Sequence, residues 1–388
     1  MSATLKRFLG LALGFFLLYA LTAQRGLGWG DSGEFQHWVL ERTDYVCGQS
    51  FSNSHPLYVW FARLFSVTPF HVTLVSAFFG ALSVGGLFLC TRNLPLSALF
   101  GIAHMPWWLS CLAEVQTMNL AFTAFGALAF LRYAKTGSAR CLAAAAFLAG
   151  LQLQVHNFAL LSLPVYAVFF LRRARFLGFA EAVLQGALAL GAWAIGAAYW
   201  LVSIAERGLG DVLVGRYGGQ VSGLVPQSPS LAAFNLALGA MSFFVPAALA
   251  WWNRQSVVGV LPRKPETRAA AALFAVNFLF FIRYFVPDQA TFALPSLFFA
   301  FILAAGFRTS APRWAALGAM QLLLPLMAWQ AAQELSLQDR LKARHKYRDE
   351  AAYFALPWKF NDDSADRCAR ELPGPWNGYP GCGEGGRR

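Results

Sequence analysis

Long apolar stretches, separated by short polar ones, follow one another along the chain from about residue 8 to residue 332. Most of them come close to the roughly 17–25 residues with which an α-helix crosses a bilayer. The pattern therefore predicts about eleven membrane-spanning helices, and a shorter aromatic stretch, 57–65, is expected to form an interfacial helix. The expected spans are residues 8–23, 69–90, 95–112, 115–133, 141–154, 157–171, 179–203, 231–252, 269–286, 290–306 and 313–332.

Composition indicates the same class of protein. Of the 388 residues, 57% are hydrophobic and 13% are charged, and the mean hydropathy is +0.47. A soluble domain cannot bury that much apolar surface, because a single core stops growing at roughly 250–300 residues. We therefore predict an all-α integral membrane protein, a polytopic helical bundle in which residues 1–335 form one transmembrane domain.

The formal net charge of +12 comes from short basic clusters between the apolar stretches. Such clusters do not form the single face or tail that indicates nucleic-acid binding; they are typical of cytoplasmic loops. The stretch after Lys6 and Arg7 then acts as an uncleaved signal anchor with the amino terminus inside. The cations expected in inner loops are Arg92, Arg132, Lys135, Arg140, Arg172, Arg173, Arg175, Arg254, Arg263, Lys264, Arg268, Arg308 and Arg313.

This topology places the loops that are poor in Lys and Arg outside. Several acidic and imidazole side chains then lie at the outer face. Ionisable side chains near membrane depth are costly and usually functional, so their convergence on one face predicts a site there. The polar residues assigned to outer loops or outer helix ends are Asp31, Glu34, His55, Glu114, Gln116, His156, Asn157 and Asp288.

Two carboxylates, Asp31 and Glu34, stand three residues apart directly after the first apolar stretch. One interpretation is structural: Asp31 is the N-cap of a helix, and Glu34 is its partner in a capping box. The other is catalytic: one carboxylate removes a proton from an acceptor hydroxyl, and the other orients that hydroxyl or helps to hold a divalent cation. Gly30 and Gly33 allow close approach of a ligand to the backbone.

Other outer residues have two interpretations each. His55 and His156 either bind a phosphate or an acceptor or are structural, as lone histidines at helix ends often are. Glu114 either caps a helix or adds a third carboxylate to the site, and Arg283 either binds substrate or pairs with Asp288. The six cysteines contain no C-x-x-C pair, so a metal or redox motif is not indicated.

Beyond residue 335 the chain is charged and ends in a Gly- and Pro-rich stretch, 372–388. This composition is typical of a disordered linker. We expect residues 336–388 to form a short outer tail, a truncated soluble domain.

Four motifs together resemble a known family. Gly30-Asp31-Ser32-Gly33-Glu34, His55-Pro56-Leu57-Tyr58, Ala113-Glu114-Val115-Gln116 and Val286-Pro287-Asp288-Gln289 are similar to a multi-pass bacterial family of unknown function, related to the protein O-mannosyltransferases of the GT-C superfamily. The resemblance covers roughly residues 5–335. The loop at His55 lacks the longer His-Pro-Pro-Gly-type turn of many relatives.

The resemblance implies a GT-C fold with a catalytic first outer loop, a polyprenyl-phosphate sugar donor with a mannose-like sugar, and inversion at the anomeric carbon. It matches Asp31 to the catalytic base and Glu34 to its partner. The acceptor is a hydroxyl on a protein or a glycan, and the active site faces outward from the bacterial inner membrane. The substrate-binding candidates are His55, Tyr58, Glu114, Gln116, His156, Asn157, Arg283 and Asp288.

Two other functions stay open. A transporter or flippase would place ionisable groups near the membrane midplane and would often show inverted repeats, whereas here the polar residues gather at one face and no repeat is visible. A non-catalytic GT-C relative is the second alternative, which the short outer tail favours and the intact acidic pair disfavours.

Overall fold

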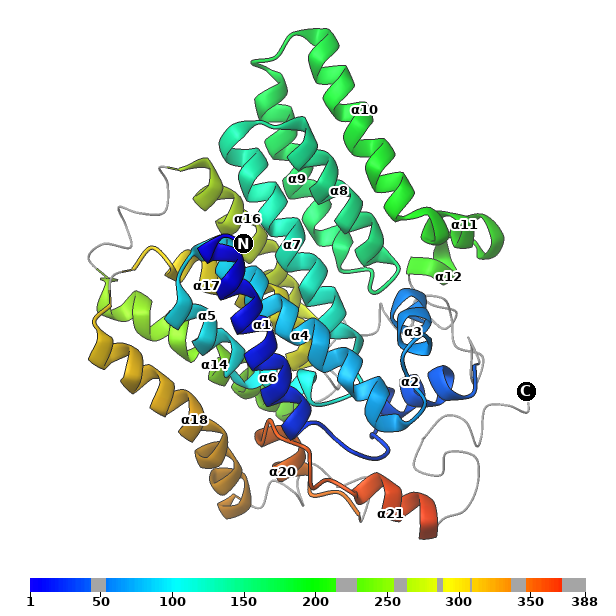
Figure 1. Ribbon diagram of the computed structural model, residues 1–388, viewed down its shortest axis with the longest axis vertical. Coiled ribbons are helices and arrows are strands. Elements are labelled where there is room, and N and C mark those ends of the chain that lie inside the picture. The colour runs from blue at the N-terminus through cyan, green and yellow to red at the C-terminus, as the bar shows by residue number, and fades with distance from the viewer. Residues whose placement is uncertain are drawn as a thin grey trace.

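The structure is a computed structural model, which describes residues 1–42, 54–213, 229–254, 264–284, 289–307, 309–335 and 347–371. Within these ranges the regular structure is entirely helical (Figure 1). The helices are α1 (Ala3–Thr22), α2 (Asp31–Leu40), α3 (Pro56–Arg63), α4 (Pro69–Thr91), α5 (Leu94–Gly101), α6 (His104–Ser110), α7 (Val115–Thr136), α8 (Ala139–Leu153), α9 (Ala159–Ala174), α10 (Phe179–Gly196), α11 (Ala198–Arg207), α12 (Leu209–Leu213), α14 (Pro229–Trp252), α16 (Pro265–Arg283), the 3-10 helix η2 (Gln289–Ala293), α17 (Leu294–Ala304), α18 (Ala311–Glu334), α20 (Glu350–Ala355) and α21 (Ser364–Glu371).

Six described helices are long and apolar enough to cross a membrane, namely α1, α4, α10, α16, α18 and residues 233–252 of α14. Two shorter apolar helices, 139–153 and 289–304, accompany them. The chain is a multi-pass membrane protein, and the expected number of eleven spans stays a prediction.

Three expected spans are not single α-helices. The stretch 95–112 is broken into α5 and α6, because the chain leaves helical geometry at Ile102 and Ala103. The stretch 179–203 is divided between α10 and α11 at Ala197. The stretch 290–306 begins as the 3-10 helix η2 before it continues as α17. Apolar composition predicted these segments correctly as helical but could not locate the breaks.

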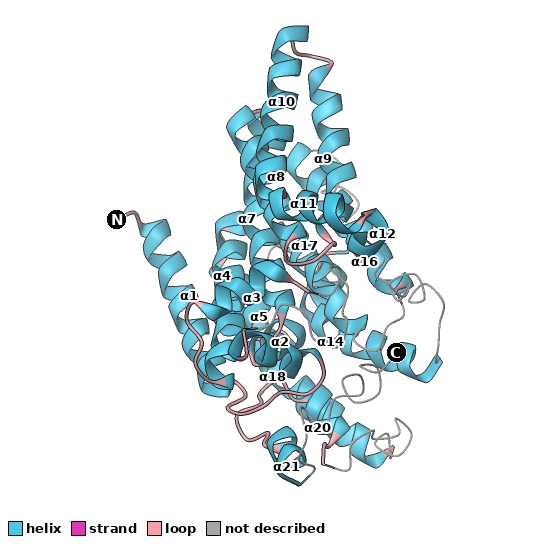
Figure 2. Cartoon of the chain, turned by 90° about the vertical axis from the view of Figure 1, so that its right-hand side faces the viewer, coloured by secondary structure: helices cyan, strands magenta, loops and turns pink. Residues whose placement is uncertain are grey.

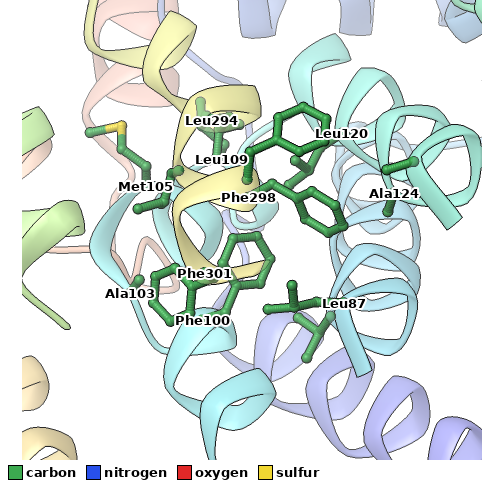
Figure 3. Packing of buried hydrophobic residues seen from close by; sticks show 14 of the residues in the cluster. Leu87, Phe100, Ala103, Met105, Leu109, Leu120, Ala124, Leu294, Phe298 and Phe301 are labelled. Carbon is green, nitrogen blue, oxygen red and sulfur yellow. The ribbon is translucent and has the colours of Figure 1, made fainter. Parts of the chain in front are cut away.

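The main core surrounds α17, which is buried on almost all sides. Phe298 and Phe301 pack edge-on against Phe100 of α5, with ring centroids 5.9 and 5.2 Å apart. Leu87 of α4 and Leu120 of α7 belong to the same cluster, and Figure 3 shows the side chains of α17 between those of α4, α5 and α7. The central helices are therefore held by packing against one another, while the outer helices expose apolar side chains to the bilayer.

The two ends of the bundle differ in chemistry. Lys135 lies in the last turn of α7, and Arg172 and Arg173 lie in the last turn of α9. Arg173 donates a hydrogen bond to the carbonyl oxygen of Thr136, 3.3 Å away, so these two basic helix ends lie side by side. The connection between α9 and α10 is at the top of Figure 1, whereas α20 and α21 are at the bottom. The direction of the bundle relative to the cytoplasm stays a prediction.

Residues 347–371 do not form the linker that composition suggested. They contain α20 and α21, and they pack beneath α1, α6 and the loop that precedes α2 (Figure 2). The reason is a set of buried aromatic side chains, including Tyr353 (7% exposed), within the otherwise charged segment. Residues 372–388 lie outside the described part of the chain.

Candidate functional site

The acidic pair lies in the first turn of α2, outside the membrane-spanning helices. The helix begins at Asp31, and its N-cap is Gly30, which has φ +57° and ψ −139°. The expectation that Asp31 is the N-cap is therefore wrong; Asp31 is the first helical residue, and no side chain caps this helix. A positive φ favours glycine, because other residues meet their own Cβ there. Gly30 thus allows the sharp entry that places both carboxylates at the positive end of the helix.

Gln36 fixes α2 to the preceding loop and to α4. This side chain is fully buried, and its Oε1 accepts a hydrogen bond from the backbone N–H of Gly28 at 2.8 Å. Its Nε2 donates to the carbonyl oxygens of Gly26 (3.2 Å) and Pro69 (3.3 Å). One amide thereby satisfies the hydrogen-bonding groups of Gly26 and Gly28. It also sets the position of the helix that carries Asp31 and Glu34.

The loop between α1 and α2 also contacts the C-terminal segment 347–371. The indole N–H of Trp29 donates to the hydroxyl of Ser364 at 2.7 Å, and the backbone N–H of Leu27 faces both carboxylate oxygens of Asp366 at 3.3 Å. Residues 22–30 therefore lie between the membrane bundle and residues 347–371.

Both carboxyl groups are harder to ionise than in water. Asp31 is exposed to solvent and Glu34 is half-buried, yet desolvation by the surrounding protein raises the pKa of Asp31 above its ordinary 3.8. Burial raises the pKa of Glu34 to about 8, and the charge on Asp31 adds to that rise. Near pH 7 Glu34 therefore holds its proton, as expected where burial and a neighbouring carboxyl group both oppose ionisation.

His55 and His156 stack on each other, with ring centroids 5.4 Å apart and 24° between their planes. His55 precedes α3 in a left-handed conformation, with φ +45°, and its ring packs against Phe35, the residue after Glu34, at 5.4 Å. The two histidines therefore lie beside α2.

The hydrogen bonds of the two rings define their tautomers. Nδ1 of His55 is 2.5 Å from the carbonyl oxygen of Val155, so this nitrogen carries the proton and Nε2 is an acceptor. Nδ1 of His156 accepts from the backbone N–H of Phe158 at 3.3 Å, so its proton is on Nε2. Burial lowers the pKa of His55 to about 4 and lowers that of His156 as well. The pair is therefore neutral at pH 7 and presents one acceptor and one donor.

Aromatic contacts extend this group to the end of α16. The ring of Phe292 in η2 is 5.8 Å from His156 and 5.1 Å from Tyr284. Tyr284 directly follows Arg283, whose side chain is exposed at the last position of α16. Arg283 thus lies next to the aromatic cluster that contains the histidines. Asp288, and with it the expected Arg283–Asp288 pair, lies outside the described residues.

Tyr58, Glu114 and Gln116 form a second group behind the first. The Tyr58 hydroxyl is fully buried and contacts Ser76 Oγ at 2.9 Å. Ser76 Oγ in turn accepts from the backbone N–H of Glu114 at 2.8 Å. Glu114 occupies the N-cap of α7 without a capping bond from its side chain, and the buried Gln116 accepts from Asn119 at 3.4 Å. Tyr58 and Gln116 are therefore placed to support the site from the protein interior.

Asn157 joins helices. Its Nδ2 donates to the carbonyl oxygen of Val212 at 2.8 Å, and its Oδ1 accepts from the indole N–H of Trp200 at 3.0 Å. Both ends of the amide are thus used within the protein. This arrangement holds α11 and α12 against the start of α9, and substrate binding by Asn157 stays a prediction without structural support.

Within the described residues, no group of three or more His, Cys, Asp or Glu side chains is arranged to hold a metal ion. Asp31 and Glu34 are two oxygen donors of the type that Mg²⁺ uses. A divalent cation between them would lower both pKa values and release the proton from Glu34. A metal at this pair stays a prediction.

Sequence reasoning did not identify Gln36, Trp29 or the C-terminal residues Ser364 and Asp366 as part of the site. The position of Gln36, a polar residue among apolar residues of a predicted helix, could have indicated its role. The sequence gives no indication of the Trp29 contact, because its partner lies 335 positions away. In the tail, the aromatic residues Tyr353, Phe354 and Trp358 within a charged segment were the available sign of burial.

No protein-family profile matches the chain, and no curated protein matches its sequence. Among solved structures, ArnT from Cupriavidus metallidurans bound to undecaprenyl phosphate is similar, with a TM-score of 0.60, 16% sequence identity, and coverage of 85% of this chain and 65% of that chain. ArnT from the same organism in the apo state gives 0.58, 15%, 84% and 63%. The chain therefore shares the fold of these two ArnT structures.

This likeness supports the expected resemblance at the level of the fold alone. The relation to protein O-mannosyltransferases stays a prediction. The chain spans less than two thirds of the ArnT chains that it matches.

Proposed function

We propose that the protein is a membrane glycosyltransferase that moves a sugar from a polyprenyl-phosphate donor to a hydroxyl of a protein or glycan acceptor. The observation that carries this proposal is the pair of carboxyl groups in the first turn of α2, next to the stacked rings of His55 and His156. The proposal is supported by the similarity in fold to ArnT bound to undecaprenyl phosphate.

In this mechanism Asp31 is the general base. Its carboxylate removes the proton from the acceptor hydroxyl, and the acceptor oxygen attacks the anomeric carbon. The bond between that carbon and the phosphate oxygen breaks, and polyprenyl phosphate leaves with the electron pair. Direct attack inverts the anomeric configuration. Glu34, which is protonated, donates a hydrogen bond that orients the acceptor.

The donor phosphate needs positive charge beside it as it leaves. The neutral histidines do not supply that charge, whereas Arg283 at the exposed end of α16 does. We assign the phosphate to Arg283 and a sugar or acceptor hydroxyl to the histidines. Such a hydroxyl can donate to Nε2 of His55 and accept from Nε2–H of His156. Glu114, Tyr58 and Gln116 support these groups from behind.

The test uses full-length protein in proteoliposomes with a panel of undecaprenyl-phosphate sugars (mannose, glucose and a pentose) and a mixture of peptide and glycan acceptors. A transferase releases undecaprenyl phosphate and forms a glycosylated acceptor, and Asp31→Asn abolishes both. A flippase moves the intact donor between leaflets without cleaving it. Transport without cleavage, or cleavage that is equal in wild type and Asp31→Asn, contradicts the proposal.

A further inference from the structure

The C-terminal segment 347–371 is attached to the bundle at α6. The indole N–H of Trp108 donates to the carbonyl oxygen of Tyr353 at 2.7 Å, and Nε2 of His104 is 2.8 Å from the carbonyl oxygen of Phe354. The rings of Trp107 and Trp358 are 5.8 Å apart. Because α6 belongs to the main core, this end of the segment is fixed to the rigid part of the protein.

The same segment is bonded to the loop that enters α2. The backbone N–H of Lys359 donates to the carbonyl oxygen of Thr22 at 2.8 Å, at the end of α1. Further along, Ser364 accepts the Trp29 indole bond at 2.7 Å and Asp366 faces the Leu27 N–H at 3.3 Å. Three residues of the segment thus bind three residues between the end of α1 and the start of α2.

These contacts are buried and closely fitted. Trp29 is 3% exposed and Ser364 is 4% exposed, so loss of either partner leaves a polar group without a hydrogen bond away from water. The guanidinium of Arg348, paired with Glu350 at 2.8 Å, lies 5.5 Å from the Trp29 ring. At Gly26 an added Cβ would come within 1.8 Å of Asp366 Oδ2. A side chain at this position would therefore displace the Asp366 carboxylate from the loop.

Asp31 depends on this loop for its direction. Only Gly30, with its positive φ, stands between Trp29 and Asp31. A glycine has more backbone freedom than any other residue, so the direction of the Asp31 carboxylate is set by what fixes Trp29 on one side and α2 on the other.

We propose that residues 347–371 are a positioning element of the catalytic site, in which Ser364 and Asp366 hold the loop that aims Asp31 at the acceptor. This inference rests on the proposed glycosyltransferase function. A displacement of about 1 Å can lower a rate roughly hundredfold, so loss of these contacts acts on turnover. Binding of the lipid phosphate, which does not involve this segment, is unchanged.

The test compares four full-length variants with wild type, using the panel donor that supports turnover. Ser364→Ala combined with Asp366→Ala removes both contacts, Ser364→Thr keeps the hydroxyl, and Gly26→Ala displaces the Asp366 carboxylate from the loop. Arg367→Ala is the matched control, since its partner is the exposed Asp363 in its own helix, 3.1 Å away. We measure kcat, KM for the donor, and hydrogen exchange of the backbone amides of residues 22–34.

We expect kcat of the double variant and of Gly26→Ala to fall about tenfold to hundredfold, with KM unchanged and faster exchange in the loop. Ser364→Thr and Arg367→Ala keep wild-type values. If Asp31→Asn is inactive while the double variant retains wild-type kcat and exchange, the inference is overturned and the proposed function stands. If wild type shows no turnover with any donor, the proposed function fails and this inference fails with it.

Discussion

The imidazole rings of His55 and His156 stack 5.4 Å apart, and the hydrogen bonds at their Nδ1 atoms leave one Nε2 as an acceptor and the other as a donor. The two residues are about a hundred positions apart in the sequence and come from different loops. A neutral pair of this kind matches a hydroxyl group, which both donates and accepts. A phosphate oxygen only accepts hydrogen bonds, so a phosphate would use the donor of this pair and leave its acceptor without a partner.

We therefore predict that His156→Phe, which keeps an aromatic ring but removes the donor, lowers kcat/KM about tenfold, the usual effect of one lost neutral hydrogen bond. Binding of undecaprenyl phosphate alone, measured by calorimetry in nanodiscs, is unchanged in this variant. Arg283→Gln is the contrasting variant and weakens that binding. Weaker binding of undecaprenyl phosphate to His156→Phe would show that the histidines bind the phosphate.

The acidic pair predicts a bell-shaped pH profile. Asp31 must be ionised to act as a base, so activity rises as pH rises through its pKa, which is above 3.8. Glu34 must be protonated to donate its hydrogen bond, so activity falls as pH rises through about 8. In Glu34→Gln, whose amide donates at every pH, the alkaline limb of kcat/KM is absent. An alkaline limb that persists near pH 8 in this variant would assign it to another group.

The same raised pKa makes folding depend on pH. Glu34 has a folded pKa of about 8 and an ordinary value of 4.5, so its contribution to stability is complete below 4.5 and is lost as pH rises through about 8. We predict that the melting temperature of Glu34→Gln equals that of wild type at pH 4 and exceeds it increasingly up to about pH 8, with no further change above. Thermal unfolding in detergent across this range measures the difference. An equal melting temperature at pH 9 contradicts the burial of this carboxyl group.

We expect the Tyr58 hydroxyl to stabilise the fold and not to contact the substrate. Tyr58→Phe removes a buried hydroxyl that contacts Ser76 at 2.9 Å and the carbonyl oxygen of Val72 at 3.3 Å. We expect a loss of about 1 kcal/mol in the free energy of unfolding, measured by denaturation in detergent, and an unchanged KM for donor and acceptor. A tenfold rise in either KM with unchanged stability would instead place this hydroxyl in contact with substrate.

Much of the fold followed from the pattern of apolar stretches. Their lengths predicted the helical membrane class and the approximate positions of α4, α7, α8, α9, α14, α16 and α18. The break between α5 and α6 was not predicted. Asn93, whose Oδ1 accepts from the backbone N–H of Leu96 at 3.1 Å, marks the start of α5, but nothing in the apolar run after it indicated an end at Gly101. The carbonyl oxygen of Gly101 accepts a hydrogen bond from the buried hydroxyl of Tyr19 in α1 at 2.7 Å, a contact that the apolar run does not reveal.

The candidate site was predictable in part. Scarcity of charge identified Asp31 and Glu34, and topology placed both histidines at the same end of the bundle. The internal hydrogen bonds of Asn157 and Tyr58 could not be inferred, because both partners of Asn157 lie more than forty positions away. For residues 347–371 composition wrongly predicted a disordered linker. The average polarity of this segment is high, although a few of its aromatic residues are buried.

The most direct measurement of the central claim is the single-turnover rate of undecaprenyl-phosphate release from a saturating donor, in wild type and Asp31→Asn. A positioned general base contributes about 10²–10⁴-fold to a rate. We predict a decrease of that size in Asp31→Asn, with unchanged binding of undecaprenyl phosphate and a melting temperature at pH 8 that is no lower than that of wild type. Equal release rates in the two proteins, with donor bound equally well, would contradict the assignment of Asp31 as the catalytic base.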